Sequence, residues 1–303
     1  MMNLSNMAFE GLFAYNTLVV MIGTAAVGFA AGMVGSLGVL RKRALVSDAA
    51  AHVTLAGVAT VFALTGKRDL PVLLAGALCA AIVGVAVLVF LKRFTRTRDD
   101  AVTAIVLSVG FGAGIAIVAG MTARGVPGSA GLEHFLLGHT AALTSGDAAL
   151  LAIVSVVSVS VVAMLFKEVS LIAFDQSFAA ATGWPVAFLD YLLVVLVAVM
   201  VVVGLPAAGA VLVTALVVIP PVAARQWTDR LVVMLMVAGL IGMVSAVGGV
   251  ALSAIVPRLA TGPVIVLFAA VIFFVSCLVA PKRGLLARVA RSLRSQGIAD
   301  EHG

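Results

Sequence analysis

The stretch LPVLLAGALCAAIVGVAVLVFL, residues 70–91, decides the fold of this chain. It runs for 22 residues without a single charged side chain. A helix rises about 1.5 Å per residue and the hydrocarbon core of a bilayer is roughly 30 Å thick, so about 20 apolar residues span it. The stretch is continuously apolar, whereas a transmembrane barrel strand alternates apolar and polar residues. It therefore predicts a membrane-spanning helix.

The rest of the chain has the same character. Of its 303 residues, 63% are apolar and only 11% are charged, and the mean hydropathy is +1.25. About a quarter of an ordinary soluble domain is charged, so this chain has too few polar side chains to cover a soluble globule. The composition excludes a soluble enzyme, a disordered chain and, despite the net charge of +6, a nucleic-acid binder. It predicts an all-α polytopic membrane protein whose surroundings are the lipid bilayer.

Breaks between apolar runs give the number of spans. The sixth and seventh runs are short, and only Gly204, Leu205 and Pro206 separate them, so eight spans is the alternative to nine. The nine predicted spans are 16–40, 48–66, 70–91, 101–121, 147–166, 187–203, 207–224, 231–254 and 263–280.

Lys and Arg residues are concentrated on one set of alternate loops. That set, with the C-terminal tail, holds 15 of the 19 basic residues, and the opposite loops hold four. Basic residues gather on the cytoplasmic side of membrane proteins. The predicted topology therefore places the N-terminus outside and the C-terminus in the cytoplasm.

Two predicted spans carry glycines four residues apart. Gly28 and Gly32 lie in the first span, and Gly110 and Gly114 lie in the fourth. This spacing lets helix backbones approach closely in lipid. We therefore expect these glycines to serve packing and not ligand binding.

Asp48 and His52 are the two strongly polar side chains between Ser47 and Gly66. Charged groups inside a membrane span are costly and are usually functional. Four residues apart on a helix, the two side chains share a face. A carboxylate and an imidazole make half of a site for a transition metal. A second copy of the subunit, or a close relative, would supply the same pair across a two-fold axis.

The same two residues allow other interpretations. Asp48 at the start of a span is also typical of a helix cap, since carboxylates complement a helix N-terminus. His52 would then be an incidental polar residue near the interface. A proton relay is a third possibility. Spacing alone does not choose among the three.

Two loop segments carry further candidates. The long external loop 122–146 holds Glu133, His134 and His139, which are a possible entry point for a metal, although external histidines are most often only solvated. The cytoplasmic segment 174–183, FDQSFAAATG, predicts a short interfacial helix. On such a helix Phe174 and Phe178 are four residues apart and share a face.

Motifs of several catalytic classes are absent from the sequence. There is no G-x-x-x-x-G-K-[ST], so the chain does not bind ATP through a P-loop. There is also no H-E-x-x-H and no G-x-S-x-G, which argues against an intramembrane protease. We therefore expect a protein that is not itself an enzyme.

Several segments together resemble the permease subunits of the ABC-3 family, which import manganese, zinc or iron in bacteria. In LRKRALVSDAAAHVTLAG, residues 40–57, a basic pair is followed by Leu, Asp and a His four residues on. The segment AFDQSFAAATGWP, residues 173–185, is similar to the family's cytoplasmic coupling segment. GAVLVTALVVIPPVAAR, residues 209–225, and TGPVIVLFAAVIFF, residues 261–274, are similar to two further family stretches. The chain departs from the pattern at Pro221, where the family usually has Ala.

The resemblance implies an importer of three parts. A periplasmic or lipid-anchored metal-binding protein delivers the ion, two permease subunits form the path, and two cytosolic ABC ATPase subunits drive transport. Residues 1–284 would be the permease domain and 285–303 a cytoplasmic basic tail. The location implied is the bacterial inner membrane. A proton- or sodium-coupled carrier, or a membrane scaffold without transport activity, remains the alternative.

The resemblance also assigns roles to residues. Asp48 and His52 would face the metal path, and the cargo would be Mn²⁺, or else Zn²⁺ or Fe²⁺, with no permanently bound cofactor. The contact with the ATPase would be made by Phe174, Asp175, Phe178 and Gly183.

Overall fold

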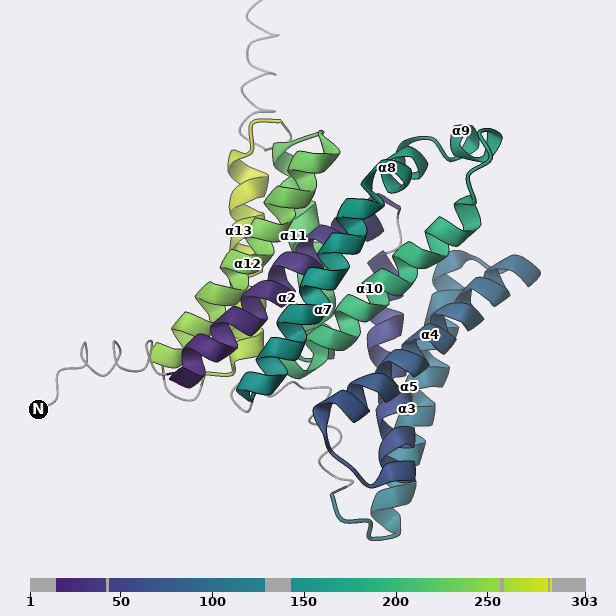
Figure 1. Ribbon diagram of the computed structural model, residues 1–303, viewed down its shortest axis with the longest axis vertical. Helices are drawn as coiled ribbons and strands as arrows, with labels where there is room; N and C mark the ends of the chain where they lie inside the picture. Colours follow the sequence, from purple (N-terminus) through teal and green to yellow (C-terminus); the bar gives the residue numbers. More distant parts are fainter. Residues whose placement is uncertain (1–14, 42–43, 129–142, 257–258, 283, 285–303) are drawn as a thin grey trace, which may run out of the picture.

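The computed structural model describes residues 15–41, 44–128, 143–256, 259–282 and 284, and these form helices and their connections without a strand (Figure 1). The tail 285–303 lies outside the described residues. In chain order the helices are α2 (Tyr15–Leu40), α3 (Ala44–Thr65), α4 (Leu70–Phe94), α5 (Asp99–Ala123), α7 (Ser145–Met164), α8 (Phe166–Phe174), α9 (Gln176–Ala181), α10 (Val186–Ala208), α11 (Ala210–Trp227), α12 (Leu231–Ile255) and α13 (Thr261–Val279).

Eight of the described helices are long and apolar enough to cross a membrane, namely α2, α3, α4, α5, α7, α10, α12 and α13. The prediction of an all-α polytopic membrane protein is confirmed. The remaining predicted span, 207–224, is present as α11, an 18-residue helix that follows α10 directly. Gly209 separates the two helices with a φ of 86°, a conformation that costs glycine little and other residues much. The region therefore forms two helices separated at Gly209, and the choice between eight and nine spans stays a prediction.

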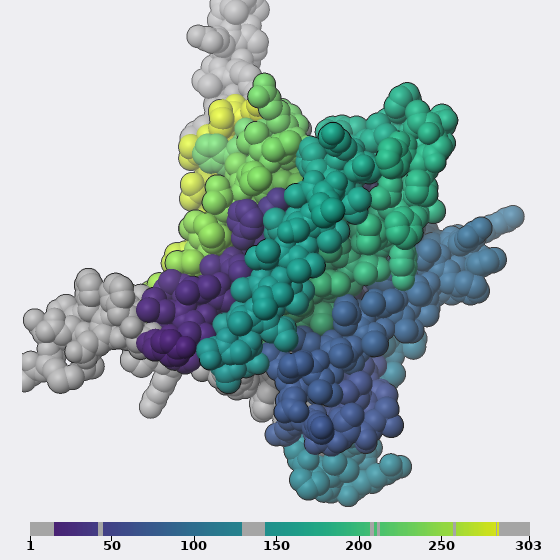
Figure 2. All heavy atoms as spheres, viewed as in Figure 1, coloured from purple at the N-terminus to yellow at the C-terminus, as the bar shows by residue number. Residues whose placement is uncertain are grey.

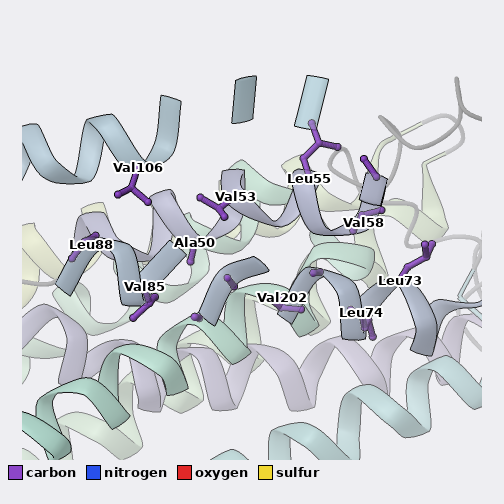
Figure 3. Packing of buried hydrophobic residues seen from close by; sticks show 14 of the residues in the cluster. Ala50, Val53, Leu55, Val58, Leu73, Leu74, Val85, Leu88, Val106 and Val202 are labelled. Carbon is purple, nitrogen blue, oxygen red and sulfur yellow. The ribbon is translucent and has the colours of Figure 1, made fainter. Parts of the chain in front are cut away.

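Helix α10 joins two halves of the bundle. On one side it packs with α3 and α4, and on the other with α2 and α11. The first half has a core of buried aliphatic side chains from α3, α4, α5 and α10. Figure 3 shows part of this core, with Val53 and Val58 of α3 among Val85 of α4, Val106 of α5 and Val202 of α10. The buried side of α3 is thus covered by its neighbours.

Glycines bring helix backbones together, as the sequence predicts. A Cβ atom built on Gly28 of α2 would lie 2.5 Å from the carbonyl oxygen of Gly242 in α12. One built on Gly110 of α5 would lie 2.5 Å from Val53 in α3, and one on Gly114 would lie 2.7 Å from Leu55. Real Cβ atoms do not approach so closely, so these positions require glycine.

Successive long helices run in opposite directions, so alternate connections share an end of the bundle (Figure 1). We call the end that holds Arg41, residues 92–98, residues 165–185 and residues 228–230 the basic end. Lys282, after α13, pairs with Asp229, before α12, at 2.7 Å and so belongs to the same end. At the opposite end, Arg68 donates a hydrogen bond to the carbonyl of Gly128. The assignment of the basic end to the cytoplasm stays a prediction.

Large apolar side chains are exposed along the outer helices. Examples are Phe90 of α4, Val109 of α5, Val156 of α7 and Phe274 of α13. In Figure 2, α7 covers the face in view between α2 and α10. Such contiguous apolar surface is unusual for a protein in water and is what contact with lipid requires.

Candidate functional site

Asp48 lies inside helix α3 and not at its beginning. Among the described residues α3 begins at Ala44, four residues earlier than the predicted span, so Asp48 is in the second turn. The interpretation of Asp48 as a helix cap is therefore wrong, because a capping residue precedes the first turn. His52 lies roughly 12 Å along the axis of α3 from Ala44. Both side chains project from the body of a helix that is long enough to cross the membrane.

One narrow stripe of α3 is accessible. From Val46 to Thr60 every residue of α3 is buried except four, and these four are spaced by four residues: Asp48, His52, Ala56 and Thr60. The stripe is roughly 18 Å long. Its polar side chains are the carboxylate, the imidazole and the Thr60 hydroxyl, which donates a hydrogen bond to the Ala56 carbonyl at 2.6 Å. Sequence reasoning found Asp48 and His52 but not Ala56 and Thr60, which continue their i, i+4 spacing.

The two predicted ligands are close but are not joined by a hydrogen bond. Nε2 of His52 is 3.6 Å from Oδ1 of Asp48, which is beyond normal hydrogen-bond distance. The side chain of His52 is 22% exposed and that of Asp48 is 43% exposed. Nδ1 of His52 is buried and has no hydrogen-bond partner among the described residues. Buried polar atoms normally have a hydrogen-bond partner. Nδ1 of His52 is therefore an exception among the described residues.

The described residues of this chain do not form a complete metal site by themselves. Among the described residues no three His, Cys, Asp or Glu side chains come together as a metal would require. Asp48 and His52 therefore offer two ligands, while a transition metal takes four to six. The predicted completion of the site by a second subunit is compatible with this geometry. Glu133, His134 and His139, the possible entry residues, lie outside the described residues.

The predicted coupling segment is two helices and not one. Phe174 is the last residue of α8, Asp175 has an extended backbone, and Phe178 lies in α9. The prediction that the two phenylalanines share one helix face is wrong. The Asp175 carboxylate accepts a hydrogen bond from the Phe178 backbone N–H at 2.9 Å and caps α9. Asp residues favour this position, so the sequence held a signal for the break.

Both phenylalanines of the segment are exposed, although they lie on different helices. Phe174 is 72% and Phe178 is 55% exposed. Behind them, Ile172 of α8, Ala179 of α9 and Leu189 of α10 form a small buried cluster. Gly183, with a φ of 86°, ends the segment. The segment thus presents aromatic side chains outward while it is anchored to the start of α10.

Arg41 also belongs to this region. In the sequence it is one of the basic residues between predicted spans, with no predicted role at the site. Its Nε and Nη2 atoms donate to Oδ1 of Asp190 at 3.2 and 2.8 Å. Its Nη1 atom donates to the carbonyl oxygen of Ile172 at 2.9 Å. The two side chains are only 12% and 19% exposed. Arg41 and Asp190 are 149 positions apart, so no local sequence signal reveals the pair.

Comparison with known proteins gives a consistent result. A family model described as the ABC 3 transport family matches residues 14–280. The manganese transport system membrane protein MntC of Bacillus subtilis is 41% identical over 279 residues, which cover 92% of this chain and 64% of that protein. The chain thus spans somewhat less than two thirds of that relative's length. The zinc transport system membrane protein TroC of Treponema pallidum is 39% identical over 282 residues, covering 93% of this chain and 95% of that protein.

Solved structures give a similar result. The structure of PsaBC from Streptococcus pneumoniae in complex with Fab matches with a TM-score of 0.79 and 28% identity. The match covers 91% of this chain and 96% of that chain. The arrangement of helices described above is therefore shared with that protein.

Proposed function

Because the chain belongs to the ABC 3 transport family, we propose that it is the permease subunit of an ATP-driven importer of divalent transition metals. Mn²⁺ is the proposed cargo, with Zn²⁺ and Fe²⁺ as alternatives. Relatives named for manganese and for zinc transport support this range of metals. The chain itself is proposed to have no enzymatic activity and no permanently bound cofactor.

The accessible stripe of α3 carries the proposal. Asp48 is 43% exposed in the isolated chain, and lipid would not solvate its charge. A charged group in a span faces a bundle interior or a water-filled path. A second permease, either an identical copy or a paralogue, would cover the stripe and bring a second Asp and His to it. Four ligands would then surround an ion.

The chemistry of these ligands suits the proposed cargo. Carboxylate and imidazole groups bind Mn²⁺, Fe²⁺ and Zn²⁺, whereas thiolates favour softer metals. The two cysteines, Cys79 in α4 and Cys277 in α13, lie on other helices than the stripe. The site therefore favours borderline and hard divalent ions over Cu⁺.

The energy for transport is proposed to enter at the basic end. Exposed Phe174 and Phe178 project there, and buried aromatic anchors commonly dominate protein interfaces. We assign this contact to cytosolic ABC ATPase subunits, with Asp175 and Gly183 fixing the shape of the segment. The basic end would face the cytoplasm of a bacterial cell, in accordance with the charge bias. A periplasmic or lipid-anchored binding protein would deliver the ion at the opposite end.

Reconstitution of the complex in proteoliposomes tests the proposal. Wild-type complex should accumulate ⁵⁴Mn²⁺ only with ATP, and Asp48→Ala or His52→Ala should lower uptake by about 100-fold, the scale of losses at metal sites. Asp99→Asn is a matched control, since this carboxylate is 73% exposed beside Lys92. Uptake driven by a proton gradient without ATP would instead identify a secondary carrier. Normal uptake by both alanine variants would show that the stripe is not the path.

A further inference from the structure

A single guanidinium group holds both ends of the coupling segment. The segment 174–183 is preceded by Ile172 in α8 and followed by Asp190 in α10. Arg41 donates one hydrogen bond to the Ile172 carbonyl and two to the Asp190 carboxylate. The guanidinium therefore connects the two flanks of the segment to the end of α2.

The two flanks behave as one packed unit. Ile172, Ala179 and Leu189 are buried against one another, with exposures of 1%, 0% and 4%. Close packing of this kind transmits displacement and does not absorb it. A push on Phe174 or Phe178 would therefore move α8, α9 and the first turns of α10 together. Arg41 makes a polar contact between this unit and the end of α2.

Arg41 is also close in sequence to the proposed metal ligands. Helix α3 begins at Ala44, three positions after Arg41, and Asp48 lies seven positions after it. Three steps along the chain span at most about 11 Å, and this length limits how far Arg41 can move before it pulls on the beginning of α3. Helices α2 and α3 have little contact with each other, compared with the close contact of α3 with α5. The Arg41 backbone N–H donates a hydrogen bond to the Leu37 carbonyl of α2 at 3.1 Å, so movement of Arg41 would shift the last turn of α2 and the beginning of α3 together.

We infer that Arg41 is a positioning residue, which passes movement of the coupling segment to Asp48 and His52. This inference rests on the proposed function and adds the route by which the ATPase reaches the metal path. The route needs arginine in particular. Only its planar fork reaches a carboxylate and a carbonyl at once, whereas a lysine ammonium would contact one or the other.

Hydrogen exchange on the purified full-length chain tests the link without any transport assay. In Arg41→Gln, amides in residues 166–183 and in residues 44–56 should both exchange faster, by about fivefold, as expected when a local hydrogen bond is lost. Arg41→Lys should show the same pattern more weakly. If residues 44–56 exchange at the wild-type rate in both variants, Arg41 holds only the coupling segment and the inference is wrong.

Transport by the reconstituted complex tests whether Arg41 couples ATP hydrolysis to metal movement. The quantity to measure is Mn²⁺ taken up per ATP hydrolysed, which does not depend on how much complex assembles. Arg41→Lys and Asp190→Asn should lower this ratio by about tenfold, within the range known for coupling residues. An unchanged ratio in both variants would overturn the inference.

A second ion pair at the same end provides the matched control. Lys282 and Asp229 are joined at 2.7 Å but are about half exposed, and they flank α12 and α13. Exposed pairs contribute little, so Lys282→Gln should leave the ratio within about twofold of wild type. A wild-type complex without ATP-driven uptake would contradict the proposed function, and hydrogen exchange would still decide whether Arg41 links the two regions.

Discussion

The imidazole of His52 in α3 meets the ring of Phe111 in α5 edge-on, with the ring centroids 5.3 Å apart and the planes at 83°. Edge-to-face contacts of this kind contribute about 0.5–1.5 kcal/mol. The contact fixes the plane of the imidazole, so its nitrogens keep their directions. Nε2 stays toward Asp48, and Nδ1 stays buried without a partner among the described residues. Under the proposed function, Phe111 would hold His52 in one orientation for an arriving ion.

Removal of this ring should weaken metal binding without abolishing it. Phe111→Ala frees the imidazole to rotate, so the affinity of the complex for Mn²⁺ should fall by about 2- to 13-fold, the equivalent of one aromatic contact. Equilibrium binding of ⁵⁴Mn²⁺ measures it. Phe90→Ala is the control, because Phe90 contacts the tilted ring of Phe94 in α4 and is exposed. Equal losses in the two variants would mean that the ring contact has no special role.

The contact between α2 and α12 should tolerate no side chain. Gly28→Leu places atoms where the Gly242 backbone now lies, and overpacking typically costs about 1–3 kcal/mol or more. The fraction of protein that stays monodisperse after heating in detergent should drop sharply. Gly112→Ala in α5 is the matched control, since nothing lies within 4 Å of a Cβ built there. If Gly28→Leu is as stable as Gly112→Ala, the close approach is not a structural requirement.

Loss of an aromatic side chain from the coupling segment should release the ATPase. Phe178→Ala should weaken ATPase binding by about 30-fold, because a buried aromatic anchor typically contributes about 2 kcal/mol. Pull-down titration of the solubilised permease measures the affinity. Phe274→Ala serves as control, since this side chain is 65% exposed but lies on α13. Wild-type affinity in Phe178→Ala would move the ATPase contact to another part of the basic end.

The predicted orientation can be checked by labelling from each side of the membrane. In a background with Cys79→Ala and Cys277→Ala, a cysteine in place of Thr95 should react only from the cytoplasm. A cysteine in place of Lys67 should react only from outside, because the two positions are exposed at opposite ends of the bundle. An impermeant maleimide added to cells and to inverted vesicles measures this. Reversed labelling would put the coupling segment on the wrong side for a cytosolic ATPase.

The spans and the polar pair were predictable because their signals are local. An apolar run such as residues 70–91 predicts a membrane span without reference to any other part of the chain. The i, i+4 spacing of Asp48 and His52 likewise places them on one helix face by helix geometry alone. The prediction of a single helix through 174–183 failed because it followed the phenylalanine spacing and overlooked Asp175, a residue that favours helix caps. The predicted span began at Asp48, whereas α3 begins four residues earlier among the described residues and includes Ala44, Leu45, Val46 and Ser47.

The other features depend on distant parts of the chain. Arg41, Ile172 and Asp190 come from three separate helices or their ends, and composition around each gives no sign of the others. The stripe can be recognised only from the exposure of each residue in the structure. Ala56 and Thr60 are of the same residue types as their buried neighbours and differ from them in exposure. Sequence alone therefore identified the polar pair Asp48 and His52 but not the surface on which they lie.

The glycine contact between α2 and α12 is mutual, and this limits how the protein can change over time. A Cβ on Gly28 would strike the Gly242 carbonyl, and a Cβ on Gly242 would strike the Gly28 carbonyl. Most packing defects can be repaired when the opposing residue becomes smaller. Here the opposing residue is already the smallest, and the obstacle is its backbone. A lineage that loses either glycine cannot recover by a substitution at the other, so the two positions should vary only when the helices themselves move apart.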